Sequence, residues 1–211
     1  MRILFFDTET NGLPKGPRGS TNPHDWPAIV QLAWQTWEFD EAPRQRTSVS
    51  YILLPSPELV WDLGSQAFHQ ITKERALAEG VEPTEALAAF RAALAECAVV
   101  IAHNLAFDKP VLSSEISRRG LSALPWPSIE CCTMMASKDY CRLPSAYSRT
   151  EHKFPKLSEL HALLFGTNTP IVFHNAANDV EATVACFRRL VALGVIPLDV
   201  WEFALRVDWA T

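Results

Sequence analysis

The chain has 211 residues, of which 48% are hydrophobic and 20% charged, and its formal net charge is −5. This composition is typical of a soluble globular protein, and it argues against a protein that depends on a broad basic surface for nucleic-acid affinity. No apolar stretch is long enough to span a membrane, and the N-terminus does not resemble a signal peptide. We therefore expect a cytoplasmic protein with no membrane partner and, from its length, a single domain over 1–211.

The first third of the chain predicts three strands. Apolar or alternating runs cover 3–7, 29–39 and 47–54, and the glycine- and proline-rich segment 11–27 is expected to be a loop. The close spacing of the three runs indicates an antiparallel meander.

Helices and strands alternate in the rest of the chain. Helices are expected to begin at Thr72 and to cover 83–97, 103–119, 157–165 and 175–193, with strands over 98–102 and 129–134 and a loop over 139–155. This order predicts a mixed α/β sheet with helices on its faces, a core of about 3–195 and a short tail over 196–211.

The five cysteines give a weaker signal. Cys131 and Cys132 are adjacent, Cys141 follows them and His152 lies beyond, without the paired spacing that is typical of zinc sites. Buried reduced thiols are the simpler interpretation, and a zinc site is the alternative.

Asp7 and Glu9 end the first predicted strand. Residues two apart on a strand point to the same face, so both carboxylates aim at one spot. Two such charges raise one another's pKa unless a cation lies between them, and hard divalent cations with oxygen ligands supply one. An acidic pair on a solvated strand tip is the alternative interpretation.

Two further acidic residues lie near helix starts. Asp108 is one turn into the helix after strand 98–102, and Asn104 shares its helix face. Asp179 is one turn into the last long helix, and His174 precedes that helix. Taken singly, each aspartate is explained by the helix dipole, which favours an acid in the first turn.

Together these three features resemble the DEDD family of 3′–5′ exonucleases, the DnaQ-like group with the ribonuclease H-like fold, which includes the proofreading epsilon subunit of DNA polymerase III. Residues 7–13, 104–108 and 174–179 are similar to its three motifs in order and separation. His174 stands five residues before Asp179, as in the histidine (DEDDh) branch, whereas Asn175 occupies the position of the tyrosine in the other branch. The resemblance implies a ribonuclease H-like mixed five-stranded sheet, antiparallel in its first three strands and flanked by helices.

The resemblance also implies catalytic roles. Asp7, Glu9, Asp108 and Asp179 would hold two divalent cations, Mg²⁺ or Mn²⁺, with Asp7 shared between them. Two ions about 4 Å apart activate a water and stabilise the leaving oxygen of a phosphodiester. His174 would take the proton from that water, because imidazole titrates near neutral pH.

Contacts with the 3′-terminal nucleotide are implied as well. Thr8 and Thr10 would hold the 3′-hydroxyl, and the remaining candidates would stack on, wedge or bind the last nucleotides: Leu13, Phe68, His69, Asn104 and Phe107. Residues 67–72 resemble the segment that lines this pocket in proofreading exonucleases, with Gln70 where the family often has glycine. Core packing for Phe68 and Phe107, and a helix cap for Asn104, are open alternatives.

Two loops mix basic and aromatic residues, which suits single-stranded nucleic acid, although solvated loop charge explains them equally. One contains Lys15, Arg18 and His24, and the other contains Lys138, Arg142, Arg149, Lys153 and Lys156 among Tyr140, Tyr147 and Phe154.

The predicted function is a metal-dependent 3′–5′ exonuclease that releases nucleoside monophosphates from single-stranded or frayed DNA ends in replication or repair. Short RNA or tRNA ends are the alternative substrate. The alternative of another class is a polymerase-associated subunit that acts mainly by binding, with an interface on the tail residues Trp201, Phe203, Leu205 and Trp209.

Overall fold

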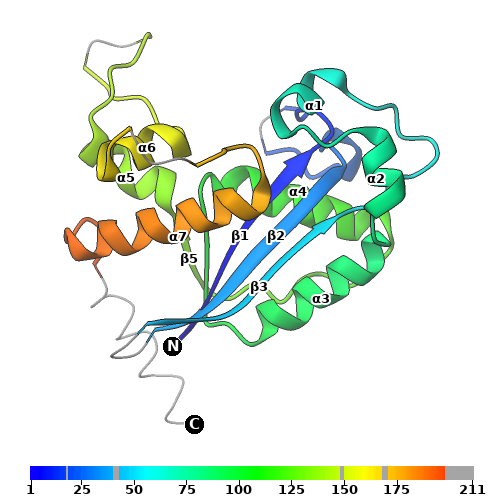
Figure 1. Cartoon of the computed structure of the whole chain (residues 1–211), viewed down its shortest axis with the longest axis horizontal. Helices are drawn as coiled ribbons and strands as arrows, with labels where there is room; N and C mark the ends of the chain where they lie inside the picture. The colour runs from blue at the N-terminus through cyan, green and yellow to red at the C-terminus, as the bar shows by residue number, and fades with distance from the viewer. Residues whose placement is uncertain (18, 40–42, 148–149, 168–170, 198–211) are drawn as a thin grey trace.

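The computed structural model describes residues 1–17, 19–39, 43–147, 150–167 and 171–197. These residues contain a five-stranded sheet with the order β3-β2-β1-β4-β5 (Figure 1). β1 (Arg2–Thr10), β2 (Ile29–Glu38) and β3 (Arg44–Ile52) pair antiparallel, and β4 (Val99–Ala102) and β5 (Ile129–Cys132) extend the sheet in parallel with β1. The predicted mixed sheet with an antiparallel meander is confirmed.

Helices cover both faces of the sheet. In chain order they are the 3₁₀ turn η1 (Pro23–Asp25), α1 (Leu63–His69), α2 (Lys73–Glu79), α3 (Pro83–Ala95), α4 (Leu105–Arg118), α5 (Thr133–Cys141), α6 (Leu157–Phe165) and α7 (Ala176–Ala192). Leu4 and Phe6 of β1 pack with α3 and α4, whereas Ile3 and Phe5 pack with α6 and α7. Because side chains alternate along a strand, this one apolar run contributes to both cores.

The topology brings three distant segments to one end of the sheet. β1 and β4 are parallel neighbours, so their carboxyl ends lie together. The chain leaves β4 and enters α4 through Asn104, which has the left-handed φ of 76°. α7 begins beside the carboxyl end of β1 (Figure 1).

α5 differs from the prediction, which placed a strand up to residue 134 and a loop from residue 139. The buried residues of α5 are Thr133, Ser137 and Cys141, which recur every four positions. This buried face is polar or small, so the sequence shows no apolar helical period there. The Ser137 hydroxyl is satisfied inside the protein because it donates to the carbonyl of Thr133 at 2.7 Å.

α1 was not predicted as a helix. Its seven residues are too few to show a helical period, and His69 is the one that is buried. Asp62 caps its start by accepting a hydrogen bond from the Ser65 amide at 2.5 Å, and Gln70 ends it with a φ of 57°. The helices expected at 103 and 175 begin two residues and one residue later, because Asn104 and Asn175 are their N-caps.

Some predictions concern parts of the chain for which the structure gives no description. Arg18, Arg149 and the tail residues Trp201, Phe203, Leu205 and Trp209 lie outside the described residues. The single-domain organisation stays a prediction. Within the described ranges, no helix has the length and apolar character that crossing a membrane requires.

Candidate active site

Three carboxylates meet at the carboxyl end of β1. Asp7 and Glu9 point to the same side of the strand, and Asp179 reaches them from the first turn of α7. One carboxylate oxygen of each lies within 4.8 Å of the others. Each residue offers oxygen ligands only, and this is the donor set that Mg²⁺ and Mn²⁺ prefer.

Asp108 lies beside this group and is oriented by the residue between Asp7 and Glu9. It is almost fully buried, in the first turn of α4. One of its oxygens accepts hydrogen bonds from Thr8, at 2.7 Å from the hydroxyl and 3.2 Å from the amide. Thr8 therefore links the second acidic motif to the first, because its hydroxyl donates a hydrogen bond to Asp108.

Burial of the four carboxylates raises their pKa values, and repulsion between their charges adds to this effect. Burial raises the pKa of Asp7 well above its usual range, and the charges of Asp108, Asp179 and Glu9 raise it further. Burial and the charges of Asp179 and Asp108 raise the pKa of Glu9 to about 8. Burial also raises the pKa of Asp108 to about 7 and that of Asp179 to about 6, although hydrogen bonds from Thr8 and from the His174 amide oppose these shifts. A cation among them would relieve this cost.

One oxygen of this group has no partner. Oδ1 of Asp179 is buried and accepts no hydrogen bond from any residue that the structure describes, whereas Oδ2 accepts one from the His174 amide at 3.1 Å. An unpaired buried carboxylate oxygen costs free energy unless a ligand completes it. The four carboxylates also line a cavity of about 360 Å³, so there is room for such a ligand.

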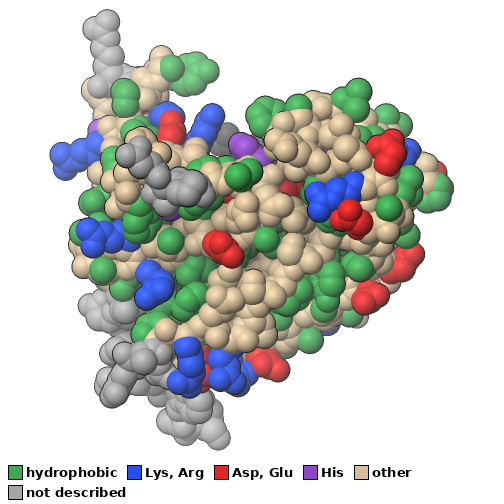
Figure 2. Space-filling model, viewed as in Figure 1, with side chains coloured by type: hydrophobic (Ala, Val, Ile, Leu, Met, Phe, Trp, Pro, Cys, Tyr) green, Lys and Arg blue, Asp and Glu red, His purple; other side chains and the backbone are tan. Residues whose placement is uncertain are grey.

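His174 stands at the edge of this cavity. It is exposed, precedes α7, and has a left-handed φ of 65°. Its ring packs edge-on against Phe68 of α1, with 5.5 Å between ring centres. Figure 2 shows histidine and acidic side chains together on this face, between the α1 region and the α5–α6 region.

The residues expected to contact substrate fall into two groups. Phe107 and Asn104 line the cavity, and Asn104 occupies the N-cap position of α4 without a capping hydrogen bond from its side chain. Leu13 and Phe68 are largely exposed, at 76% and 65%.

The side chains of Thr10 and His69, which were expected to contact the substrate, are buried. The Thr10 hydroxyl donates to the carbonyl of Gly12 at 2.9 Å, within the loop after β1. His69 is 5% exposed, and its Nδ1 accepts a hydrogen bond from the Ile71 amide at 3.0 Å. Among the described residues, Nε2 of His69 has no hydrogen-bond partner, and contact of Thr10 and His69 with the substrate stays a prediction.

Residues 154–157 and Met134 also line the cavity. The sequence named Phe154 and Lys156 as candidates for contact with single-stranded nucleic acid, but it did not place this segment beside the acidic residues. Their position depends on His103, which is buried at the end of β4. Its Nε2 lies 3.1 Å from the carbonyl of Pro155, and its Nδ1 lies 2.9 Å from the Thr133 hydroxyl. Nothing in the local sequence of either segment signals this long-range contact.

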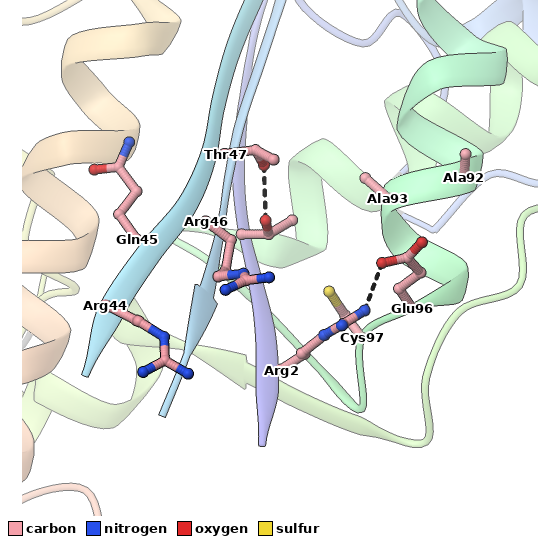
Figure 3. A pocket seen from close by; sticks show the side chains of 10 residues that line it. Arg2, Arg44, Gln45, Arg46, Thr47, Ala92, Ala93, Glu96 and Cys97 are labelled. Carbon is pink, nitrogen blue, oxygen red and sulfur yellow. Dashed lines mark hydrogen bonds and ion pairs between the residues drawn. The ribbon is translucent and has the colours of Figure 1, made fainter. Parts of the chain in front are cut away.

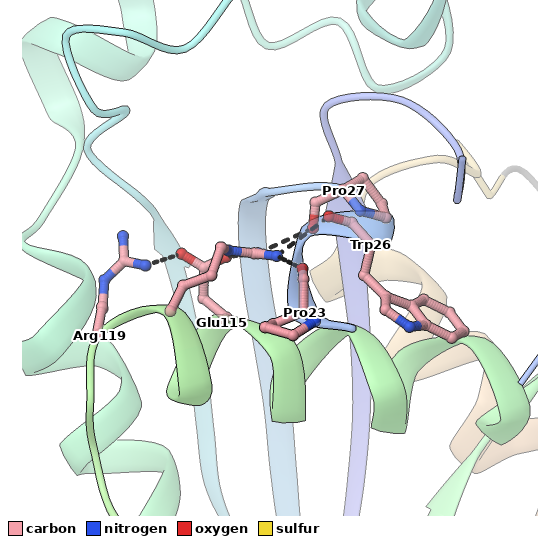
Figure 4. Close-up of polar contacts among 6 residues, drawn as sticks. Pro23, Trp26, Pro27, Glu115 and Arg119 are labelled. Atoms are coloured by element: carbon pink, nitrogen blue, oxygen red, sulfur yellow. Dashed lines mark hydrogen bonds and ion pairs between the residues drawn. The ribbon is translucent and has the colours of Figure 1, made fainter. Parts of the chain in front are cut away.

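At two larger cavities, the acidic residues named below are paired with arginines. One, of about 440 Å³, lies at the opposite end of β1, where Arg2 pairs with Glu96 at 2.6 Å (Figure 3). The other, of about 550 Å³, lies beside the loop after β1, where Glu115 pairs with Arg118 and Arg119 (Figure 4). The acids named here are matched by guanidinium groups. In the described chain, the cysteines and His152 form no group that could hold a metal.

The chain is similar to a known protein family and to several solved structures. Residues 4–187 match the family model described as Exonuclease (RNase T). No curated protein sequence matches the chain. Among solved structures, Escherichia coli exonuclease I in complex with a dA13 oligonucleotide has a TM-score of 0.69 at 18% identity, over 90% of this chain and 40% of that one.

Two further structures are similar. The zinc-bound E. coli exonuclease I complex with single-stranded DNA has a TM-score of 0.66 at 20% identity, over 96% of this chain and 43% of that one. Exonuclease I from Methylocaldum szegediense has a TM-score of 0.66 at 17% identity, over 90% of this chain and 40% of that one. This chain thus spans about two fifths of their length, and the likeness concerns the fold. The family match covers most of the sequence, and the chain therefore belongs to the exonuclease family and has the ribonuclease H-like fold.

Proposed function

We propose that this protein is a metal-dependent 3′–5′ exonuclease of the histidine type, which removes nucleoside monophosphates from single-stranded or frayed DNA ends. The observation that carries the proposal is the group formed by Asp7, Glu9 and Asp179, whose oxygens lie within 4.8 Å without a cationic partner. In a chain of the exonuclease family, divalent cations and a phosphodiester are the ligands that such a group suits best.

The four carboxylates would hold two Mg²⁺ or Mn²⁺ ions. Asp7 is central, because its carboxylate feels the charges of all three other acids. Glu9 and Asp179 complete the same group, and Asp108, whose charge also acts on Asp7, is held by Thr8. When bound, the ions supply an activated water and stabilise the departing oxygen.

His174 is the proposed general base. It lines the cavity beside Asp179, and its exposed ring is free to accept a proton from the attacking water and release it to solvent. Its backbone amide holds Asp179, so the base and one metal ligand are placed by the same turn.

The nucleotide at the 3′ end would lie over this acidic group. Asn104 and Phe107 form one side of the cavity, and the exposed side chains of Leu13 and Phe68 stand outside it, where bases could stack. We favour DNA over RNA because the similar exonuclease I structures are complexes with DNA oligonucleotides.

Degradation of oligonucleotides tests this proposal. Single-stranded DNA and RNA of one sequence, labelled at the 5′ or the 3′ end, would be incubated with the protein and Mg²⁺, Mn²⁺ or EDTA. We expect 5′-labelled DNA to shorten stepwise and 3′-labelled DNA to release a labelled mononucleotide at once, only with a divalent cation. Stepwise shortening of 3′-labelled DNA, or undiminished cleavage in EDTA, would contradict the proposal.

A further inference from the structure

The cavity has an acidic floor and one basic side chain on its wall. Among the described residues that line it, Lys156 is the one lysine or arginine, and it is exposed. It belongs to a segment that we call the 154–157 wall, formed by Phe154, Pro155, Lys156 and Leu157, all of which line the cavity.

The backbone of the 154–157 wall is held in place from both sides. The Pro155 carbonyl accepts a hydrogen bond from His103 Nε2 at 3.1 Å, since a carbonyl can only accept. The Lys156 amide donates to Oε2 of Glu159 at 2.8 Å, at the start of α6. His103 is buried at the end of β4, so the wall is tied to the strand next to the catalytic one.

Neighbouring lysines make direct contacts with other side chains, whereas the charge of Lys156 acts on Glu159 from a greater distance and helps to lower its pKa. Lys153 pairs with Glu159 at 2.5 Å, and Lys138 lies over the ring of Phe154 at 4.8 Å from its centre. The ammonium group of Lys156 makes no hydrogen bond and no ion pair within 4.0 Å with any residue that the structure describes. A cation on a fixed backbone, at the wall of a cavity whose floor is proposed to bind a phosphodiester, is suited to a phosphate.

We propose that Lys156 binds a backbone phosphate next to the scissile one, and that Phe154, backed by Lys138, supports the sugar or base attached to it. The proposal rests on the proposed exonuclease function and identifies where the strand leaves the cavity. The ring of Phe154 is 42% exposed, which leaves area for such a contact. Because it engages the strand away from the reacting atoms, Lys156 contributes to binding and not to the chemical step.

The test compares Lys156→Gln, Lys156→Arg and a charge-matched control, Lys73→Gln, which is on α2 and absent from the cavity lining. Steady-state hydrolysis of oligo(dT) with Mn²⁺, and binding of a 5′-fluorescein oligo(dT) by anisotropy in EDTA, where no cleavage is expected, would be measured over a series of salt concentrations. For Lys156→Gln we expect KM and Kd to rise by about tenfold with kcat nearly unchanged. The slope of log Kd against log salt should fall by about 0.7, the value for one phosphate on a single strand.

Lys156→Arg should restore most of the binding, and Lys73→Gln should match the wild type. Unchanged KM, Kd and salt slope in Lys156→Gln would overturn the proposal, and so would a loss confined to kcat. If the wild type binds DNA without cleaving it from the 3′ end, the exonuclease function fails, and the anisotropy data still decide whether Lys156 contacts a phosphate.

Discussion

Two buried acidic regions of this molecule differ in whether arginine side chains neutralise the carboxylates. Glu115 on α4 is 2% exposed, and both of its oxygens accept hydrogen bonds from guanidinium groups, one from Arg118 and one from Arg119 (Figure 4). Arg118 also donates to the carbonyls of Pro23, Trp26 and Pro27, so this ion pair fastens the loop after β1 to α4.

The carboxylates at the end of β1 have no such partners. Asp7, Glu9 and Asp179 are packed together, and one Asp179 oxygen accepts nothing. A buried carboxylate is costly unless it is paired, and the fold supplies arginines where the acid serves structure. Where several acids lie together, they raise one another's pKa values, and a cationic ligand would lower this cost.

Replacing Asp7 should break the acidic site most completely. Asp7→Asn keeps the shape of the side chain but removes the shared ligand, so we expect hydrolysis to fall below detection while the thermal midpoint stays the same or rises. Glu96→Gln is the matched control, because that acid lies in an exposed ion pair at the other end of the sheet. Near-normal activity of Asp7→Asn in Mg²⁺ would refute the assignment.

His174→Ala should lower kcat by about 10²–10⁴-fold, the usual contribution of a general base, without loss of metal binding. His152→Ala, a histidine outside the cavity lining, serves as the control. Equal loss of metal affinity and rate would instead make His174 a ligand.

Glu115→Ala tests the other side of the comparison. Removing one partner of a buried ion pair leaves two guanidinium groups uncompensated, so unfolding in urea should become easier by about 3–5 kcal/mol. Glu181→Ala, an exposed acid on α7, should change the free energy of unfolding by less than about 0.5 kcal/mol. Equal effects of the two substitutions would show that the Glu115 pairing contributes little.

The pH dependence of stability should report the unpaired carboxylates directly. In the folded, metal-free protein the pKa of Glu9 is raised to about 8 and that of Asp179 to about 6. Unfolded carboxyl groups titrate near about 4, so the folded state holds protons longer and loses stability as pH rises from about 4 to about 8. Thermal midpoints in EDTA should fall across that range, and Mn²⁺ should restore them most at the upper end; midpoints that rise in EDTA would contradict the shifts.

The exposed pair of Arg2 and Glu96 should give the smallest effect. Its side chains are 44% and 68% exposed, so solvent screens the charges. A double-mutant cycle with Arg2→Ala and Glu96→Ala should give a coupling below about 1 kcal/mol, and lower still in high salt. A coupling as large as the Glu115 effect would remove the contrast between exposed and buried pairs.

Much of this architecture could be predicted from the sequence. Apolar runs identified the strands. The grouping of Asp7, Asp108 and Asp179 was expected from the family resemblance, because the helix dipole alone explains an acid at each helix start. α5 was missed because its buried face is Thr133 and Ser137 rather than hydrophobic.

The rest of the site depends on contacts between distant segments. The burial of His69, and the hydrogen bond by which His103 brings the 154–157 wall to the cavity, involve no local pattern. The roles of the catalytic and substrate-binding residues stay predictions until they are tested.

The central claim, that the group at the end of β1 holds divalent cations, is tested most directly by Mn²⁺ binding. EDTA-treated wild type and Asp7→Asn, dialysed free of chelator, would be titrated with Mn²⁺ near pH 8, and free Mn²⁺ followed by electron paramagnetic resonance. We predict saturable binding in the wild type that Asp7→Asn loses. Equal binding by the two proteins, or none by the wild type, would contradict the account.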